Sequence, residues 1–222
     1  MGLKLAIFDM DGTLVDSRQS IQNAMSTAFK ACGLPPPAYD ETRQIVGLGL
    51  NEACRTLAPD YRDLARLVTA YKQAFVDQRQ TQDFQEPLYD GALATLERLA
   101  NDNWLIGMAT GKSHAGIRAV FQRHPLAGYF DTIWCADDGP GKPHPFMCHE
   151  AMKAVGADES LSVIIGDAIF DMQMGRAANI HALGVNWGFG DEAELRAAGA
   201  HDVHHSFEAL NHGLDQFAEA AQ

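Results

Sequence analysis

Short apolar runs recur along the chain, and each has the composition of a β-strand that is buried on both faces. These runs lie at residues 3–8, 104–109, 133–136, 162–165 and 181–185. Within them apolar and polar side chains do not alternate, which is typical of parallel strands covered by helices on both sides. Amphipathic helical segments separate the later runs, and in one of them Leu93, Leu96 and Leu99 share a face. The alternation predicts an α/β fold, an open parallel sheet with right-handed crossovers.

One stretch, from about residue 16 to residue 86, carries helical patterns only. Helices are expected at residues 17–32, 41–46, 52–57 and 60–80. In the last of these, Leu67, Tyr71 and Phe75 fall on one face. Glycine and proline clusters separate the helices. We therefore predict an all-helical cap domain at residues 16–86, inserted after the first strand into a core formed by residues 1–15 and 87–222.

The composition indicates a folded globular protein. The chain has 222 residues, of which 46% are hydrophobic, and this is too apolar for a disordered segment. Its net charge of −12 opposes the contacts with phosphates that non-specific nucleic-acid binding needs. The apolar run at the N-terminus is too short for a signal sequence or a membrane span. We expect a cytoplasmic protein that binds neither nucleic acid nor membranes.

Neither the cysteines nor a group of histidines near the C-terminus forms a clear disulfide or metal-binding pattern. The four cysteines are widely spaced and form neither a CxxC pair nor a zinc pattern, so we expect buried, reduced thiols. We expect His201, His204 and His205 to lie in an exposed acidic loop rather than in a metal site. Whether the chain forms a homodimer stays open.

Polar residues follow the predicted strands at the points where the strands end. The carboxyl ends of parallel strands meet at one edge of a sheet, and ligands of open α/β sheets bind in the crevice there. The residues that converge at this edge are Asp9, Asp11, Gly12, Thr13, Thr110, Gly111, Lys142, Asp167 and Asp171. Taken singly, each has a plain structural explanation, such as a turn or a helix cap. Their occurrence together, in this order, favours a common site.

The chemistry of this set is that of phosphoryl transfer. Asp9 and Asp11 lie two residues apart, so in extended backbone their side chains lean the same way and repel each other unless a cation is present. Asp167 and Asp171 add oxygen ligands, which favours Mg²⁺. Lys142 and the start of a helix near Thr110 supply positive charge and hydrogen-bond donors. A carboxylate nucleophile, a general acid/base and groups that hold a phosphoryl anion are therefore all present.

Four segments resemble, in order, the motifs of the haloacid dehalogenase-like (HAD) hydrolases. They are FDMDGTLVDS at residues 8–17, ATGK at 109–112, GKPHP at 141–145 and GDAIFD at 166–171. The resemblance covers nearly the whole chain and extends to the phosphoglycolate phosphatase-like branch. It implies a Rossmann-like core with a helical cap inserted after the first motif.

The resemblance also implies an activity and a role for each residue. The enzyme would be a Mg²⁺-dependent phosphomonoesterase that hydrolyses a small phosphorylated metabolite, with 2-phosphoglycolate favoured. Asp9 would attack phosphorus to form an aspartyl-phosphate, and Asp11 would protonate the leaving group and then activate water. The groups that hold the phosphoryl would be Gly12, Thr13, Thr110, Gly111 and Lys142. The metal ligands would be Asp9, the backbone carbonyl of Asp11, Asp167 and, in support, Asp171.

Alternatives to this reaction remain open. The same scaffold serves a phosphomutase, or a phosphatase acting on a sugar phosphate, a nucleotide or pyrophosphate. Ala168 stands where the HAD motif often has a hydroxyl residue, and Phe146 stands where a polar residue is frequent, so the substrate is undecided. In a different class, a receiver-like signalling protein also gathers acidic residues, Thr and Lys around a phospho-aspartate. Such a domain is about half this length and carries its phospho-acceptor after a middle strand.

Overall fold

The computed structural model describes residues 2–220, which form a six-stranded, all-parallel sheet with strand order β3-β2-β1-β4-β5-β6. The strands are β1 (Leu5–Phe8), β2 (Leu105–Thr110), β3 (Thr132–Cys135), β4 (Ser162–Gly166), β5 (His181–Val185) and β6 (Asp202–His204). This confirms the predicted Rossmann-like α/β class. The strand order reverses between β1 and β4, and a crevice opens outside the carboxyl ends of the strands at such a point.

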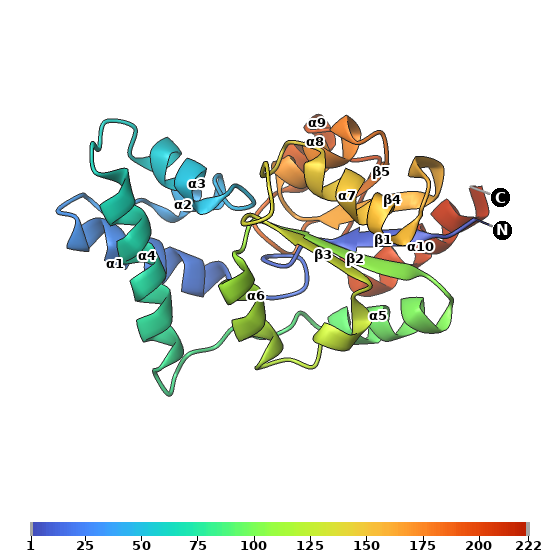
Figure 1. Cartoon of the computed structure of the whole chain (residues 1–222), viewed down its shortest axis with the longest axis horizontal. Helices are drawn as coiled ribbons and strands as arrows, with labels where there is room; N and C mark the ends of the chain where they lie inside the picture. Colours follow the sequence, from blue (N-terminus) through green and yellow to red (C-terminus); the bar gives the residue numbers. More distant parts are fainter. Residues whose placement is uncertain (1, 221–222) are drawn as a thin grey trace.

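Helices cover both faces of the sheet (Figure 1). One face is covered by α5 (Ala92–Asn101), α6 (His114–Phe121) and α10 (Phe207–Ala220), and the other by α7 (Phe146–Val155), α8 (Ile169–Ala177) and α9 (Glu192–Ala197). In β1, Ala6 and Phe8 belong to the first apolar layer, whereas Leu5 and Ile7 belong to the second. Every side chain of this strand is therefore buried, which explains why its sequence shows no polar alternation.

The remaining helices form a group of their own, to one side of the sheet (Figure 1). They are α1 (Arg18–Ala31), α2 (Tyr39–Arg43), α3 (Leu50–Leu57) and α4 (Leu64–Arg79). Met25, Phe29, Leu67 and Phe75 belong to the separate apolar cluster that holds these helices together. Helix α2 begins two residues before its predicted start and also ends earlier.

The chain passes between this helical group and the sheet twice, and the two passages lie side by side. The Asp16 N–H donates a hydrogen bond to the Pro87 carbonyl at 2.8 Å, and Val15 and Leu88 form an isolated antiparallel bridge. The division into a core of residues 1–15 and 87–222 and a cap of residues 16–86 stays a prediction.

The histidines near the C-terminus do not all lie in the exposed loop that the sequence predicts. We predicted an exposed loop, but Asp202–His204 forms the edge strand β6 beside β5, and His204 is only 7% exposed. His201 and His205 are exposed, as expected. The prediction for His204 is wrong because a strand of three residues is too short to show a recognisable pattern. The burial of its side chain comes from packing against Gly213 of α10.

Two further expectations can be compared with the described residues. All four cysteines are free thiols, three of them buried and Cys32 half-buried. Across residues 2–220, the helices are too short or too polar for any of them to span a lipid bilayer.

Candidate active site

Three carboxylates meet at the carboxyl ends of β1 and β4. Asp9 directly follows β1, and its N–H donates to the Ile165 carbonyl at 2.9 Å, which continues the pairing of the two strands. Asp167 directly follows β4, and Asp171 lies in the first turn of α8. Carboxylate oxygens of Asp9, Asp167 and Asp171 lie within 4.8 Å of one another, and all three residues are buried. The fold therefore brings together three of the four aspartates singled out in the sequence.

A buried lysine joins two of these carboxylates. Lys142 Nζ lies 2.7 Å from Asp9 Oδ1 and 2.6 Å from Asp171 Oδ1, and the lysine is only 1% exposed. Burial raises the pKa of Asp9 to about 7 even though Lys142 opposes the shift. Burial also raises the pKa of Asp167 well above its ordinary value, and the charges of Asp9 and Asp171 add to this. One ammonium thus only partly balances the negative charge that these groups would carry when ionised.

The three aspartates fit a small divalent cation. Their donor atoms are all oxygens, and Asp11 lies at the same end of β1. Burial makes an uncompensated group of carboxylates unfavourable, and a hard cation removes that penalty. Mg²⁺ prefers a few carboxylate ligands together with phosphate oxygens and water. The residues present therefore match the metal expected from the sequence.

Asp167 is held by neighbours on both of its oxygens. The Thr13 hydroxyl donates to Oδ1 at 3.1 Å, and the Phe189 N–H donates to Oδ2 at 2.7 Å. Gly12 has a φ of +81°, and a Cβ at this position would overlap the Asp167 carboxylate. The turn after β1 therefore requires glycine and orients Asp167. The predicted contact of Gly12 and Thr13 with a phosphoryl group stays a prediction.

Lys112 lies in the site, although the sequence predicted no role for it. Its Nζ lies 2.7 Å from Asp11 Oδ1 and 3.9 Å from Glu86 Oε1. The backbone N–H of Lys112 also donates to the Thr110 hydroxyl at 3.3 Å. Lys112 therefore positions both Asp11 and the end of β2. Its position in the ATGK motif is the feature of the sequence that could have identified it as a site residue.

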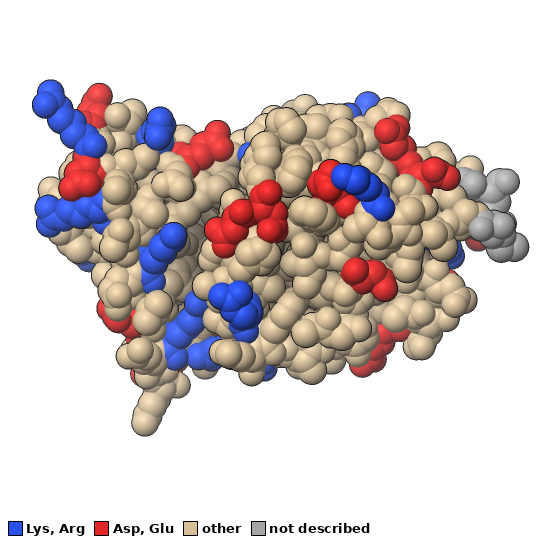
Figure 2. Space-filling model, viewed as in Figure 1, with Lys and Arg blue, Asp and Glu red and all other residues tan. Residues whose placement is uncertain are grey.

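A cavity of about 590 Å³ lies between the sheet and the helical group. Asp9, Asp11 and Thr110 line its sheet side, and residues 45–53 and α4 line its helical side. On the face drawn in Figure 2, Lys and Arg side chains gather over the helical half and along its boundary with the sheet half. Asp9, Asp11 and Thr110 therefore face a chamber that is enclosed by segments distant in sequence.

The loop at residues 47–49 is in contact with the second motif. A Cβ placed on Gly111 would lie 2.9 Å from the carbonyl oxygens of both Gly47 and Leu48. Only glycine allows the two backbones to approach this closely. The helical group thus reaches the site through this loop.

Gly111→Ala should push this loop away from the sheet. We expect kcat/KM to fall about 10- to 100-fold, because small displacements of groups around a substrate are costly, while the thermal midpoint changes little. Steady-state kinetics and a melting curve would measure both. Gly128→Ala is the matched control, because a Cβ at Gly128 meets no atom within 4 Å among residues 2–220. Equal kinetics for the two variants would contradict the role of this contact.

Comparison with known proteins agrees with the motifs and the fold. A family model described as Haloacid dehalogenase-like hydrolase matches residues 6–185. The protein named Probable phosphatase IndB from Dickeya dadantii is 33% identical over 198 residues, covering 87% of this chain and 86% of its own length. A Phosphoglycolate phosphatase from Agrobacterium fabrum is 28% identical, covering 84% and 82%. The crystal structure of a hydrolase from Pseudomonas syringae superposes with a TM-score of 0.86 and 28% identity, covering 96% and 98%.

Proposed function

The chain belongs to the haloacid dehalogenase-like hydrolases and is a phosphatase of that family, and we propose that it is a Mg²⁺-dependent phosphomonoesterase. Its substrate would be a small phosphorylated metabolite, with 2-phosphoglycolate as the leading candidate. The observation that carries the proposal is the placement of Asp9. It lies at the sheet side of the cavity, paired with Lys142 and close to Asp167 and Asp171. The proposal includes a cap formed by residues 16–86 that covers this site.

In the first step Asp9 is the nucleophile. Lys142 pairs with its Oδ1, which leaves Oδ2 to attack phosphorus. The bond from phosphorus to the ester oxygen breaks as the aspartyl-phosphate forms, and Asp11 gives a proton to the departing oxygen. Thr110, Gly111 and Lys142 hold the phosphoryl oxygens while charge shifts between them.

In the second step water releases the phosphate. Asp11, now a carboxylate, takes a proton from a water molecule, whose oxygen attacks phosphorus as the bond to Asp9 breaks. Inorganic phosphate leaves, and both aspartates return to their starting states. Lys112, 2.7 Å from Asp11, keeps this carboxylate directed toward the site.

The divalent ion would be held by Asp9, the Asp11 carbonyl and Asp167, with Asp171 in support. When bound, it offsets the negative charges of the nucleophile and the phosphate so that they can approach. Asp171 also accepts a hydrogen bond from the Ala168 N–H at 3.1 Å and pairs with Lys142, which keeps it in place.

The helical side of the cavity supports an anionic leaving group. Lys72 and Arg79 from α4 line it, and the Arg79 guanidinium lies 5.0 Å from the Phe75 ring centroid. Arg79 Nε is buried and has no hydrogen-bond partner among residues 2–220. A carboxylate such as that of 2-phosphoglycolate would complete its hydrogen bonding.

Arg79→Gln should raise KM for 2-phosphoglycolate about tenfold, the effect of losing one partly exposed charge-assisted hydrogen bond. Ethyl phosphate, which lacks the carboxylate, should be affected little. Parallel kinetics on both esters would measure the selectivity. Arg62→Gln, an exposed residue outside the cavity, is the control. An equal rise in KM for both esters would show that Arg79 does not bind the carboxylate of the leaving group.

Phosphate release from a panel of small esters tests the proposed function. 2-Phosphoglycolate, sugar phosphates, nucleotides and pyrophosphate would be assayed with Mg²⁺ and with EDTA. We expect one compound to be hydrolysed much faster than the others, and EDTA to abolish its turnover. Turnover that is unchanged in EDTA would refute the metal requirement. Conversion of a sugar phosphate to its isomer without phosphate release would instead establish a phosphomutase.

A further inference from the structure

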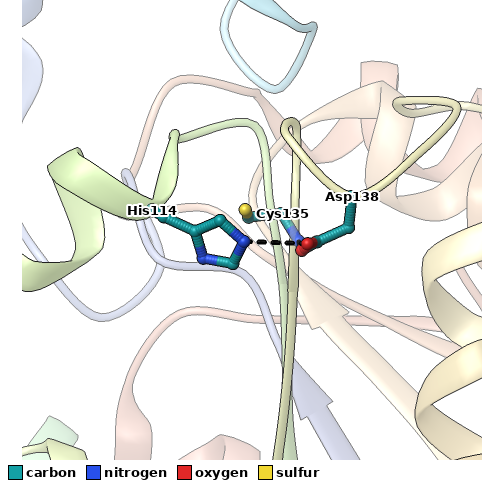
Figure 3. Close-up of side chains that lie close together, drawn as sticks. All are labelled: His114, Cys135 and Asp138. Carbon is teal, nitrogen blue, oxygen red and sulfur yellow. Dashed lines mark hydrogen bonds and ion pairs between the residues drawn. The ribbon is translucent and has the colours of Figure 1, made fainter.

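A second group of metal-ligating side chains lies outside the phosphoryl site. His114 begins α6, Cys135 ends β3, and Asp138 lies in the loop that follows β3 (Figure 3). One donor atom from each lies within 4.8 Å of the others, and His114 Nε2 is 2.8 Å from Asp138 Oδ1. None of the three is needed by the reaction proposed above.

The fold assembles this group at the edge of the sheet that carries the active site. Strands β2 and β3 are neighbours, with Thr110 paired to Cys135. The start of α6, just after β2, therefore meets the end of β3. These elements are joined by hydrogen bonds from His114 N to Asp137 Oδ2 at 2.8 Å and from Ala136 N to Lys112 O at 3.1 Å.

Backbone contacts also fix the orientation of the carboxylate. The Cys135 N–H donates to Asp138 Oδ2 at 2.9 Å, which turns Oδ1 toward the imidazole. Cys135 is fully buried, whereas the His114 side chain is 46% exposed. The group therefore has a fixed interior side and an open exterior side through which an ion can enter.

The donor set selects a different ion from the one expected at Asp9. It offers one sulfur, one imidazole nitrogen and one carboxylate oxygen, whereas Mg²⁺ takes oxygen ligands almost exclusively. Zn²⁺ and Co²⁺ accept this mixture in tetrahedral sites, with bonds of about 2.0–2.3 Å. We propose that His114, Cys135 and Asp138 bind one divalent transition-metal ion of the Zn²⁺ class, with water at the fourth position.

Binding exchanges a proton for the ion. The Cys135 S–H bond breaks, a sulfur–metal bond forms and the proton passes to solvent. The hydrogen that His114 Nε2 donates to the ionised Asp138 carboxylate must also leave this nitrogen, because its lone pair is what binds the ion. The bound ion joins α6 to the loop after β3, and Ser113, Ala136 and Asp137, which adjoin its ligands, line the cavity. The site should therefore stabilise this wall of the chamber.

Cobalt titration tests the proposal. Untagged, metal-stripped protein would be titrated with Co²⁺ in excess Mg²⁺, which occupies the all-oxygen site. We expect one equivalent to produce a thiolate-to-cobalt charge-transfer band and the visible bands of tetrahedral Co²⁺. At least one proton should be released per ion, and Zn²⁺ should displace the cobalt and raise the melting temperature.

Variants assign the band to these residues. Cys135→Ser should abolish it, and His114→Gln should weaken Co²⁺ binding more than about 100-fold, beyond the usual effect of losing a residue that only orients a ligand. If the buried Cys135→Ser variant fails to fold, His114→Gln at the exposed ligand still tests the proposal. Cys54→Ser and His212→Gln, at a buried cysteine and an exposed histidine elsewhere, are the controls. Absence of the band in the unmodified protein, or its persistence in Cys135→Ser, would overturn the proposal.

Discussion

Asp9→Asn is expected to abolish phosphate release, lowering kcat by about 10⁴-fold or more, because an amide cannot form the aspartyl-phosphate on which the proposed route depends. The protein should remain folded. Asn has nearly the same shape, and the substitution removes one negative charge from a buried group whose pKa is already raised to about 7. Lys142 keeps its second partner, Asp171.

The measurement is a single-turnover assay on the panel's preferred ester, with thermal unfolding of the same samples. Trapping with labelled substrate should show a phospho-protein in the unmodified enzyme and none in Asp9→Asn. Asp83→Asn, an exposed aspartate, is the matched control and should behave like the unmodified enzyme. Residual activity of a few per cent, in a correctly folded variant, would exclude Asp9 as the nucleophile.

Lys142→Met should lose both activity and stability. Its ammonium lies within 2.7 Å of two buried carboxylates, and breaking a buried ion pair by removing one partner costs about 3–5 kcal/mol. Without it, Asp9 and Asp171 face each other uncompensated, and Asp9 should take up a proton at higher pH than before. Urea unfolding, monitored by circular dichroism, would measure the loss.

Two companion measurements separate charge from packing. Lys142→Met with Asp171→Asn should recover part of the lost stability, because one of the uncompensated carboxylates is then neutral. Mg²⁺ should stabilise Lys142→Met more than the unmodified enzyme, since the ion restores the missing positive charge. If the double variant were less stable than Lys142→Met, uncompensated charge would not explain the loss.

Similarity to known proteins favours some of the alternative functions over others. The family match over residues 6–185 and the similarity to phosphatases over most of the chain support an enzyme and disfavour a receiver-like signalling protein. A phosphomutase shares the nucleophile, and the ester panel distinguishes it. The rapid turnover of a phospho-protein would separate both enzymes from a signalling switch.

The sequence by itself determined the sheet class and the edge that carries the site. Five of the six strands in residues 2–220 are apolar enough to be recognised, because strands covered on both faces are composed mostly of apolar residues. Parallel strands place their carboxyl ends together, so Asp9, Thr110 and Asp167 could be assigned to one site without knowing any distance. Local pattern and topology were sufficient for both conclusions.

Only the tertiary structure decided which side chains are partners. Nothing in the sequence indicates that Lys112 pairs with Asp11. The same is true of Arg43 in α2 and Glu194 in α9, whose Nη1 and Oε2 atoms lie 2.8 Å apart between the helical group and the sheet half. The burial of His204 likewise comes from the packing of β6 against β5 and α10 rather than from its own segment.

The group of His114, Cys135 and Asp138 shows the same limit. Its members come from a helix start, a strand end and a loop, and no spacing in the sequence identifies them as metal ligands. Their approach depends on the register of β2 against β3 and on the turn that begins α6. Contacts of this kind arise from long-range packing. A periodic pattern of hydrophobic residues predicts the fold class, but it does not specify the positions of individual side-chain atoms.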